Sequence, residues 1–438
     1  MGGGLLQLVA YGAQDVYLTG NPQITFFKVV YRRHTNFALE AIQQTFNGTP
    51  NYNQRVTSQI SRNGDLIHRI YLELILPKTS ATDYCKFFGL RLLNYVEIEI
   101  GGQRIDKHYS HWMYIWNELS LPASKRSGYY DMVGAYGGSS YGSNSTAKNN
   151  NAGTINNTLY VPLEFWFCRN VGLALPLIAL QYHEVKININ FETAANCSAT
   201  GNGTGSATSN FFPTASLWVD YIYLDTDERR RFAQLSHEYL IEQLQFTGAE
   251  SVGTNTSIKP KLNFNHPCKE LVWVTTATTT GNDNWFNYTT QPTKITTGFD
   301  YRNYNSLGSA LAASPYSSAI PGYNLVSNPT KTAKLVLNGN DRFSERSGRY
   351  FNLVQSYQHH ENIPANAGIN VYSFALKPEE HQPSGSLTMS RIDTAVLNMT
   401  VDSAYSVNYG ANANLYIYAV NYNVLRILSG MGGLAYSN

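Results

Sequence analysis

One short motif in the sequence could present a nucleophilic serine. The segment Gly138-Ser139-Ser140-Tyr141-Gly142 matches G-x-S-x-G, in which a sharp turn between a strand and a helix exposes a reactive hydroxyl. Here the motif lies within a stretch of Gly, Ser and Asn, with no strand pattern before it and no helix pattern after it. No element is expected to aim Ser140, so we interpret the match as a result of local composition.

Histidines at a spacing that suits metal binding also occur. His108 and His111, preceded by Asp106, could share a metal ion if they lay on one face of a helix. No third ligand follows at a suitable spacing. His183-Glu184 and His237-Glu238 each begin like the zinc motif H-E-x-x-H but lack its second histidine. The sequence therefore predicts no metal site.

The other candidate clusters do not form a catalytic pattern. His359-His360 lies in a polar stretch, where a solvated pair is expected, and Gly430-Met431-Gly432-Gly433 lacks the spacing of a nucleotide-binding loop, so an extended, flexible end is expected. Phe165-Trp166-Phe167 could stack on sugars or bases but is more typical of a core. Paired carboxylates of a glycosidase are recognised only by geometry. We predict no catalytic residue, no cofactor and no enzymatic activity.

Composition narrows the class of protein. The chain has 438 residues, which at roughly 100–200 residues per domain predicts two or three domains. Lys and Arg number 32 against 30 Asp and Glu, and charged residues are only 14% of the chain. Because the basic clusters Arg32-Arg33 and Arg229-Arg230-Arg231 are short, direct nucleic-acid binding is not expected. A surface poor in charge suits a protein that packs against copies of itself.

Membrane and redox signals are equally informative. The longest apolar run, Val171 to Leu180, contains Pro176 and is far shorter than the ~20 residues that span a bilayer, so no membrane insertion is expected. The first residues lack the pattern of a secretory signal, and Leu6 stands where a myristoylation motif needs Ser or Thr. Four scattered cysteines are expected to be free thiols: Cys85, Cys168, Cys197 and Cys268.

The elements that would position any site are mainly strands. Apolar and polar residues alternate along 96–100, 185–192 and 397–402, which is typical of half-buried strands. Gly101-Gly102 and Asn338-Gly339 follow such patterns and can supply the positive φ angles of tight hairpins. Helix patterns are few, and the best are 109–119 and 349–355. The sequence predicts an all-β fold.

The chain also resembles itself. Phe46-Asn47-Gly48 matches Phe246-Thr247-Gly248 at an offset of 200 residues. The segment 98–104 matches 335–341 at an offset of 237, and 217–221 matches 415–419 at an offset of 198. Two copies of one β-domain would produce this pattern. We predict two consecutive eight-stranded antiparallel jelly rolls with short helices, one in residues 1–225 and the other in residues 226–438. Long polar insertions at 123–158, 194–210 and 275–330 are expected on the surface.

Several blocks resemble the major capsid proteins of nucleocytoplasmic large DNA viruses, with the greatest similarity to the algal-virus branch. The block from Gln7 to Lys28, continued to Phe37, is the longest. Further blocks are spread over the chain: Leu175 to Val185, Phe264 to Pro267, Leu337 to Phe343, Gln382 to Gly385, Ser390 to Asp393 and Asn421 to Ile427. Departures concentrate in 123–158 and 275–330, so loop lengths and surface chemistry are not transferred.

The resemblance implies a structural protein of an icosahedral virion. It implies two jelly rolls per chain and three identical chains per pseudo-hexagonal capsomer, which would contact neighbouring capsomers. It also implies minor capsid proteins beneath the shell, an internal membrane between shell and genome, and assembly in the host cytoplasm. The N-terminal block would lie at the inner base of the capsomer, and the long loops would lie outside.

Glycosylation follows from the resemblance, because algal-virus capsid proteins are glycosylated by viral enzymes that do not follow the host sequon. We expect covalent glycans on loop asparagines, with Asn287 first, Asn202 and Asn255 next, and Asn144 also a candidate. Asn-x-Ser/Thr occurs at eight positions: Asn47, Asn144, Asn156, Asn196, Asn202, Asn255, Asn287 and Asn398.

Two other functions remain open on the residues alone. A jelly-roll lectin could bind glycans through loop residues such as Trp285 and Tyr288, and a glycosidase could use an unrecognised carboxylate pair. Stable trimers that pack into hexagonal arrays would favour the capsid protein. Glycan binding would favour the lectin, and sugar release would favour the enzyme.

Overall fold

The computed structural model describes residues 3–77, 84–135, 158–198, 212–278, 281–290, 292 and 328–436. The chain divides into a small unit, Met1–Phe37, and a large unit, Ala38–Asn438. The small unit contains two short helices, α1 (Gly3–Val9) and α2 (Val16–Thr19), and none of its described side chains is buried. Phe26 and Phe27 are almost fully exposed. This unit therefore has local structure without a hydrophobic core.

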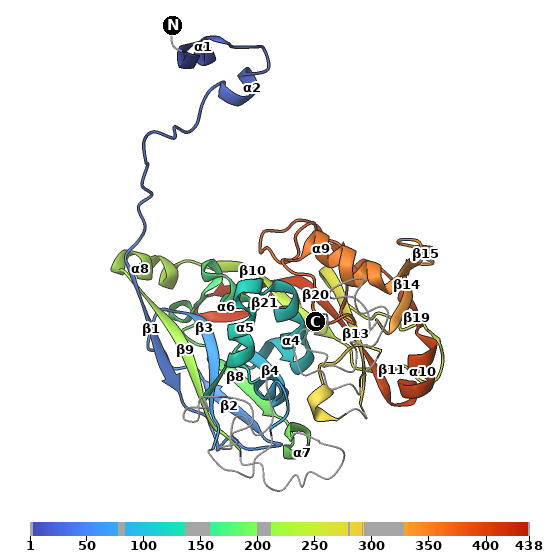
Figure 1. Ribbon diagram of the computed structural model, residues 1–438. Coiled ribbons are helices and arrows are strands. Elements are labelled where there is room, and N and C mark those ends of the chain that lie inside the picture. Colours follow the sequence, from blue (N-terminus) through green and yellow to red (C-terminus); the bar gives the residue numbers. More distant parts are fainter. Residues whose placement is uncertain are drawn as a thin grey trace, which may run out of the picture. The chain divides into compact units, whose positions relative to one another are not determined.

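The first half of the large unit forms two antiparallel sheets (Figure 1). The strands are β1 Phe37–Gln44, β2 Arg55–Gln59, β3 Leu66–Ile75, β4 Leu93–Ile100, β5 Gln103–Tyr109, β6 Thr158–Pro162, β7 Leu175–Pro176, β8 Val185–Phe191 and β9 Thr214–Leu224. One sheet has the order β1-β9-β3-β6, with β7 also paired to β3, and the other has the order β2-β8-β4-β5. Successive strands exchange between the two sheets, as in a jelly roll.

The second half repeats this arrangement. Its strands are β10 His237–Phe246, β11 Glu250–Ser251, β12 Ser257–Ile258, β13 Pro267–Ala277, β14 Thr330–Leu337, β15 Asn340–Asp341, β16 Arg346–Ser347, β17 Asn370–Ser373, β18 Leu387–Thr388, β19 Ala395–Val401, β20 Ala413–Leu428 and β21 Met431–Leu434. The orders β10-β20-β13-β17 and β12-β19-β14-β15 match those of the first half strand for strand. The predicted double jelly roll is confirmed.

The internal matches in the sequence fall at equivalent places in the two halves. The residues 200 apart follow β1 and end β10, and those 198 apart lie in β9 and β20. Both predicted hairpins form, with φ of +57° and +85° at Gly101 and Gly102, and +48° and +82° at Asn338 and Gly339. Side chains without a branched β-carbon at these turns permit the left-handed backbone that tight hairpins need.

Helices connect the strands and cover the sheets. In the first half these are α3 Phe88–Arg91, α4 Ser110–Ser120, α5 Ala123–Met132, α6 Trp166–Arg169, η1 Val171–Leu173, η2 Leu177–Ala179 and α7 Ala194–Cys197. After α8 (Thr226–Gln234) come η4 Asn282–Asn284, the π-helical turn η7 Tyr350–Val354, α9 Gln355–His359, η8 Met389–Arg391, α10 Ser403–Tyr409 and η9 Gly410–Asn412. None of the helices in the described ranges is long and apolar enough to span a membrane.

Most local predictions are confirmed, and two are wrong. The helix predicted over 109–119 is α4, and the one over 349–355 is η7 continued by α9. The stretch from Ala123, expected to be a surface loop, begins with helix α5 because Pro122 starts it and Tyr129 and Tyr130 bury one side. The C-terminal glycines are not a flexible end. They form β21, which pairs with β20, and Gly432 packs against Leu180.

The hydrophobic core is continuous between the halves. One cluster of buried side chains includes the interior of the first jelly roll together with Val272, Val274 and Tyr418 of the second. A second cluster fills the interior of the second jelly roll and includes Leu271 and Trp273. Alternate residues of β13 thus belong to different clusters, because this strand is covered on both faces. The four cysteines are free and buried.

Candidate functional site and assembly surfaces

The histidines considered for metal binding are separate structural groups. His108 ends in β5, and its Nε2 lies 2.9 Å from Asp106 Oδ2. His111 begins α4, and its Nδ1 lies 2.8 Å from the Tyr288 hydroxyl. Burial, with a smaller effect from Arg91, lowers the pKa of His111 to about 3. In the described part of the chain, no three His, Cys, Asp or Glu side chains form a metal-binding group. Ser140 lies outside the described residues.

Helix α4 forms the main contact between the two jelly rolls. Its Trp112 ring lies 5.6 Å from Tyr418 and its His111 ring 4.7 Å from Tyr416, both in β20. Glu118 Oε2 accepts a hydrogen bond of 3.2 Å from the backbone N–H of Ala365. All residues of α4 except Ser120 are buried. The outer face of the sheet β10-β20-β13-β17 is therefore covered within the chain.

The aromatic residues considered for a lectin also belong to this contact. The Trp285 ring stacks on His111 at 4.7 Å, and the Arg91 guanidinium lies 3.8 Å from its centre. Tyr288 is fully buried. Neither side chain is presented to a glycan, so the structure does not support the lectin. Phe165, Trp166 and Phe167 are buried as expected.

A buried group of charges lies next to the same contact. Glu242 of β10 pairs with Lys269 at 2.6 Å and with Arg169 of the first half at 3.0 Å. Burial acts to raise the pKa of Glu242, but Arg169, a hydrogen bond from His381 and Lys269 outweigh it and lower the value to about 2. The cations keep this carboxylate ionised between the halves.

His360 corrects an expectation from the sequence. Its side chain is not solvated: Nε2 lies 2.8 Å from Glu270 Oε2, and Nδ1 lies 2.7 Å from Glu379 Oε1. Burial would lower the pKa of His360, but the two carboxylates raise it to about 9. The polar stretch around it indicated solvent, whereas the fold returns it to Glu270 on β13. The adjacent pair Lys269-Glu270 inside an apolar strand was the signal that could have revealed this group.

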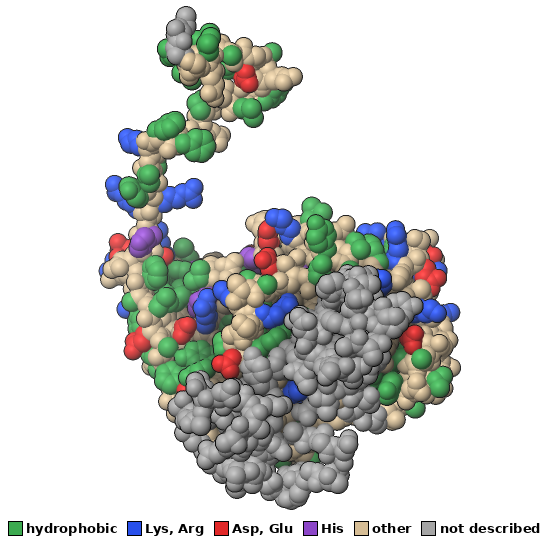
Figure 2. Space-filling view, in the orientation of Figure 1, with side chains coloured by type: hydrophobic (Ala, Val, Ile, Leu, Met, Phe, Trp, Pro, Cys, Tyr) green, Lys and Arg blue, Asp and Glu red, His purple; other side chains and the backbone are tan. Residues whose placement is uncertain are grey.

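The first-half sheet presents a face that the chain leaves uncovered. Tyr71 of β3 stacks on Trp218 of β9 at 6.4 Å, and Trp218 Nε1 donates a hydrogen bond of 2.6 Å to Glu73. Tyr160 of β6 and Asp220 of β9 lie on the same face. Figure 2 shows hydrophobic side chains gathered over β1, β9 and β3. Sequence alternation predicted the strands, but it did not reveal that this outward side is rich in aromatic residues.

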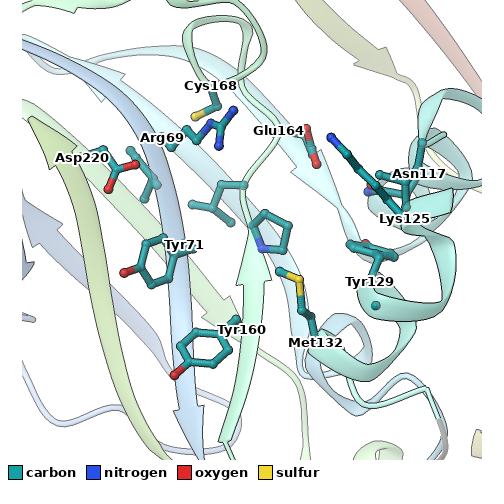
Figure 3. Close-up of a pocket in the computed structure, with 15 residues that line it drawn as sticks. Arg69, Tyr71, Asn117, Lys125, Tyr129, Met132, Tyr160, Glu164, Cys168 and Asp220 are labelled. Carbon is teal, nitrogen blue, oxygen red and sulfur yellow. The ribbon is translucent and has the colours of Figure 1, made fainter. Parts of the chain in front are cut away.

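A groove of about 780 Å³ lies between this face and helix α5. Figure 3 shows Tyr71, Tyr160 and Asp220 on the strands, with Tyr129 and Met132 across from them on the helix. The list of lining residues also includes Arg69, Lys125, Glu164 and Cys168. Burial raises the pKa values of the Glu164 carboxyl and of the Cys168 thiol, which disfavours a reactive thiolate. The groove has the chemistry of a packing surface.

Both halves of the chain match known families. A family described as "Major capsid protein N-terminus" matches residues 25–225, and one described as "Large eukaryotic DNA virus major capsid protein" matches residues 228–433. A major capsid protein of Pyramimonas orientalis virus is 52% identical, and the match covers 100% of both chains. That of Paramecium bursaria Chlorella virus 1 is 46% identical with the same coverage.

This chain belongs to the family of large eukaryotic DNA virus major capsid proteins.

A solved structure agrees with this assignment. The chain is similar to a chain in the quasi-atomic model of the PBCV-1 virus capsid, with a TM-score of 0.74 and 41% identity, and the match covers 94% of this chain and 100% of that one. The protein is therefore a structural capsid protein of a virion, as the sequence resemblance implied. The aromatic face and the groove are accordingly candidate contacts with other capsid chains.

The glycosylation candidates occupy different environments in this capsid protein. Asn287 is only 1% exposed, and its Oδ1 accepts hydrogen bonds from Thr289, so the structure does not place it on an outward surface. Asn255 is exposed, whereas Asn202 and Asn144 lie outside the described residues. Asn398 is half-buried in β19, and the Asn196 amide donates to Glu192 at 3.1 Å. The sequon alone does not indicate burial, which is why Asn287 was ranked first.

Proposed function

We propose that three copies of this chain form a pseudo-hexagonal capsomer of an icosahedral double-stranded DNA virus shell. The observation that carries the proposal is the uncovered aromatic face of β1-β9-β3-β6, whose counterpart in the second half is covered within the chain. Six jelly rolls of one topology around a threefold axis would give a nearly sixfold outline. Obligate interfaces of this kind commonly bury more than ~2,000 Å².

Light scattering of the purified chain tests the trimer. We expect a mass three times the 48.9 kDa of the chain at micromolar concentration, and hexagonal arrays of such particles by electron microscopy. A stable monomer at that concentration would contradict the proposal. Measurement over a concentration series separates a weak trimer from a true monomer.

The finer organisation is also proposed. Residues 1–225 comprise the N-terminal unit and the first jelly roll, and residues 226–438 comprise the second. The two family matches and the repeated strand orders support this division. We propose contacts with neighbouring capsomers and with minor capsid proteins under the shell, no direct binding of the genome, and assembly in the host cytoplasm. The net charge of only +2 supports the lack of direct genome binding.

Covalent glycans on the outer loops are proposed as well, with Asn255 now first among the described candidates because its side chain is reachable. Asn202 and Asn144 remain candidates, and modification at Asn287 would have to precede folding of its segment. Intact-mass measurement and peptide mapping of the virion-derived chain test this. A mass equal to that of the bare sequence would contradict it, and Asn255→Gln would identify the contribution of that site.

A further inference from the structure

The uncovered face of the first half has a covered counterpart in the second. At the offset of 198 residues, Trp218 and Asp220 of β9 correspond to Tyr416 and Tyr418 of β20. Both pairs point away from the interior of their own jelly roll, because Leu217 lies in the interior and its counterpart Leu415 does too. Tyr416 and Tyr418 are covered by α4, whereas nothing among the described residues covers Trp218 in the same way.

The edge strands show the same contrast. Residues 241–243 of β10 are buried, and the side-chain amide of Gln243 donates to the carbonyl oxygen of Ile105 in β5. The residues 200 positions earlier, 41–43 in β1, are exposed or half-buried. The whole sheet β1-β9-β3-β6 therefore lacks the cover that its counterpart receives from the first jelly roll.

The structural counterpart of α4 is the helix formed by η7 and α9. Each helix follows the equivalent hairpin, and an offset of 238 residues pairs the buried Asn117 with the buried Gln355. At this offset Trp116 and Leu119, both buried, correspond to Val354 and Tyr357. Val354 is 40% exposed and Tyr357 is 77% exposed. A small group of hydrophobic side chains lies over α9 in Figure 2.

We propose that η7 and α9 of one copy dock into the groove between α5 and the sheet β1-β9-β3-β6 of the next copy. Val354 and Tyr357 enter the groove, as Trp116 and Leu119 pack against the second half within the chain. This inference rests on the proposed self-assembly and specifies which surfaces meet. The occupant is a second copy because only the second jelly roll carries the counterpart of the helix that covers this face.

The chemistry of the two surfaces is complementary. Tyr71, Tyr160 and Met132 offer the groove an apolar and aromatic lining for Tyr357. Arg349 occupies the position of His111, which contacts Tyr416, so the same packing brings Arg349 over Trp218. An arginine above an indole, flanked by Asp220 and Glu73, is favourable through both cation–π and charge attraction.

The geometry also closes into a ring. The helix and the groove belong to different halves, so the contact is head-to-tail rather than two-fold. If the contact between chains repeats the contact within a chain, successive jelly rolls are related by one operation. Six such steps close the ring, which corresponds to three chains.

Cross-linking tests the contact directly. Within the chain, the N–H of Asn362 donates to the Leu119 carbonyl at 3.0 Å. The counterparts are Lys125, at the offset of 237, and Tyr357, at the offset of 238. The double variant Lys125→Cys/Tyr357→Cys should give covalent dimers and trimers with a short bifunctional maleimide. The native cysteines are buried, so the unmodified chain serves as the background.

Lys125→Cys/Val407→Cys is the matched control, because Val407 on α10 is also strongly exposed. Cross-linked trimers with the first pair alone support the docking. Trimers by light scattering that do not cross-link through Lys125 and Tyr357 overturn the docking but leave the proposed capsomer intact. A chain that remains monomeric overturns both.

A second comparison removes dependence on linker geometry. Tyr357→Asp should raise the dissociation constant of the trimer at least ~10-fold, because it places a charge in an apolar contact, whereas Tyr357→Phe should change it by less than ~3-fold. The exposure of Tyr357 predicts that both variants keep the melting temperature of the monomer. Equal dissociation constants for the two variants would overturn the proposal.

Discussion

His360 shows how one side chain links the fold to pH. It lies between Glu270 and Glu379, and its pKa is raised to about 9 from the ordinary value of 6.5. The stabilisation is therefore complete below pH ~6.5 and is lost as the pH rises through ~9. We predict that the free energy of unfolding falls by up to about 3 kcal/mol from this group over that interval.

Chemical denaturation at a series of pH values measures this loss. His360→Gln should flatten the decline between pH 6.5 and 9, because the titrating cation is gone. His359→Gln is the matched control, since the His359 Nδ1 lies 2.9 Å from the backbone oxygen of Leu376 and has no carboxylate partner printed beside it in the described contacts. Parallel profiles for the two variants would contradict the role of His360.

The pair Lys269–Glu242 tests the energetic value of burial. Lys269→Met removes a fully buried cation and leaves Glu242 with Arg169. We predict a loss of about 3 kcal/mol in the free energy of unfolding, as for other buried pairs that lose one partner. Lys334→Met, which breaks the exposed pair with Asp341, should cost less than ~1 kcal/mol. Similar losses in urea denaturation of the two variants would refute this distinction.

Residue-level prediction from the sequence failed where a contact is distant in the chain. His360 and Glu270 are 90 positions apart, and local polarity alone indicated solvent around His360. Asn287 was ranked as an outward glycan site for the same reason, although Thr289 accompanies it in a buried turn. Burial depends on which strands meet across the molecule, and no local pattern contains that information.

At the scale of elements, period-two alternation identified strands well because one side of each strand faces a jelly-roll interior. It was less informative for β13, which is buried on both faces, and for α5, which begins inside a composition typical of loops. The pairing of β21 with β20 depends on the space that Gly432 leaves beside Leu180, a contact between opposite ends of the chain.

Two glycines give a prediction about how segments pack. A β-carbon at Gly368 would lie 1.6 Å from the backbone oxygen of Tyr288, whereas one at Gly128 in α5 would meet nothing within 4 Å. Gly368→Ala should lower the free energy of unfolding by more than ~2 kcal/mol, because backbone must move. Gly128→Ala should raise it by ~0.5–1 kcal/mol through helix propensity.

Thermal and urea unfolding of both variants check this pair. A Gly368→Ala chain with unchanged stability would show that the segment around Tyr288 does not pack as closely as the structure indicates. A clear loss for Gly128→Ala would contradict the open space beside α5. Working below the concentration at which copies associate keeps the comparison within one chain.

At the scale of the whole molecule, the weak internal matches were the strongest guide to architecture. The offsets 200, 237 and 198 link β1 with β10, the two hairpins, and β9 with β20, and the strand orders repeat accordingly. The contact between the halves was not predictable in the same way. It joins α4 to a sheet more than 300 residues away in sequence at Tyr418, and only the assembled fold shows that one sheet is covered and its counterpart is not.

The N-terminal unit provides a final prediction at this scale. Residues 3–36 contain no buried side chain, yet Leu8, Tyr17, Phe26 and Phe27 are strongly exposed. Such apolar exposure is typical of a surface that another molecule covers. Deleting residues 1–34 should leave the melting temperature within ~2 °C, because surface changes rarely exceed ~0.5 kcal/mol. The trimer should also persist, since the docking surfaces lie in the large unit.

Assembly into larger arrays should instead be reduced by the deletion, as expected if this unit forms contacts at the base of the capsomer. Light scattering measures the trimer, and electron microscopy measures the arrays. The double variant Phe26→Ser/Phe27→Ser is the matched test, because it removes two exposed apolar groups without shortening the chain. Arrays that form equally well from all three proteins would show that the unit has no role in assembly, whereas a loss of the trimer itself would place its contacts within the capsomer.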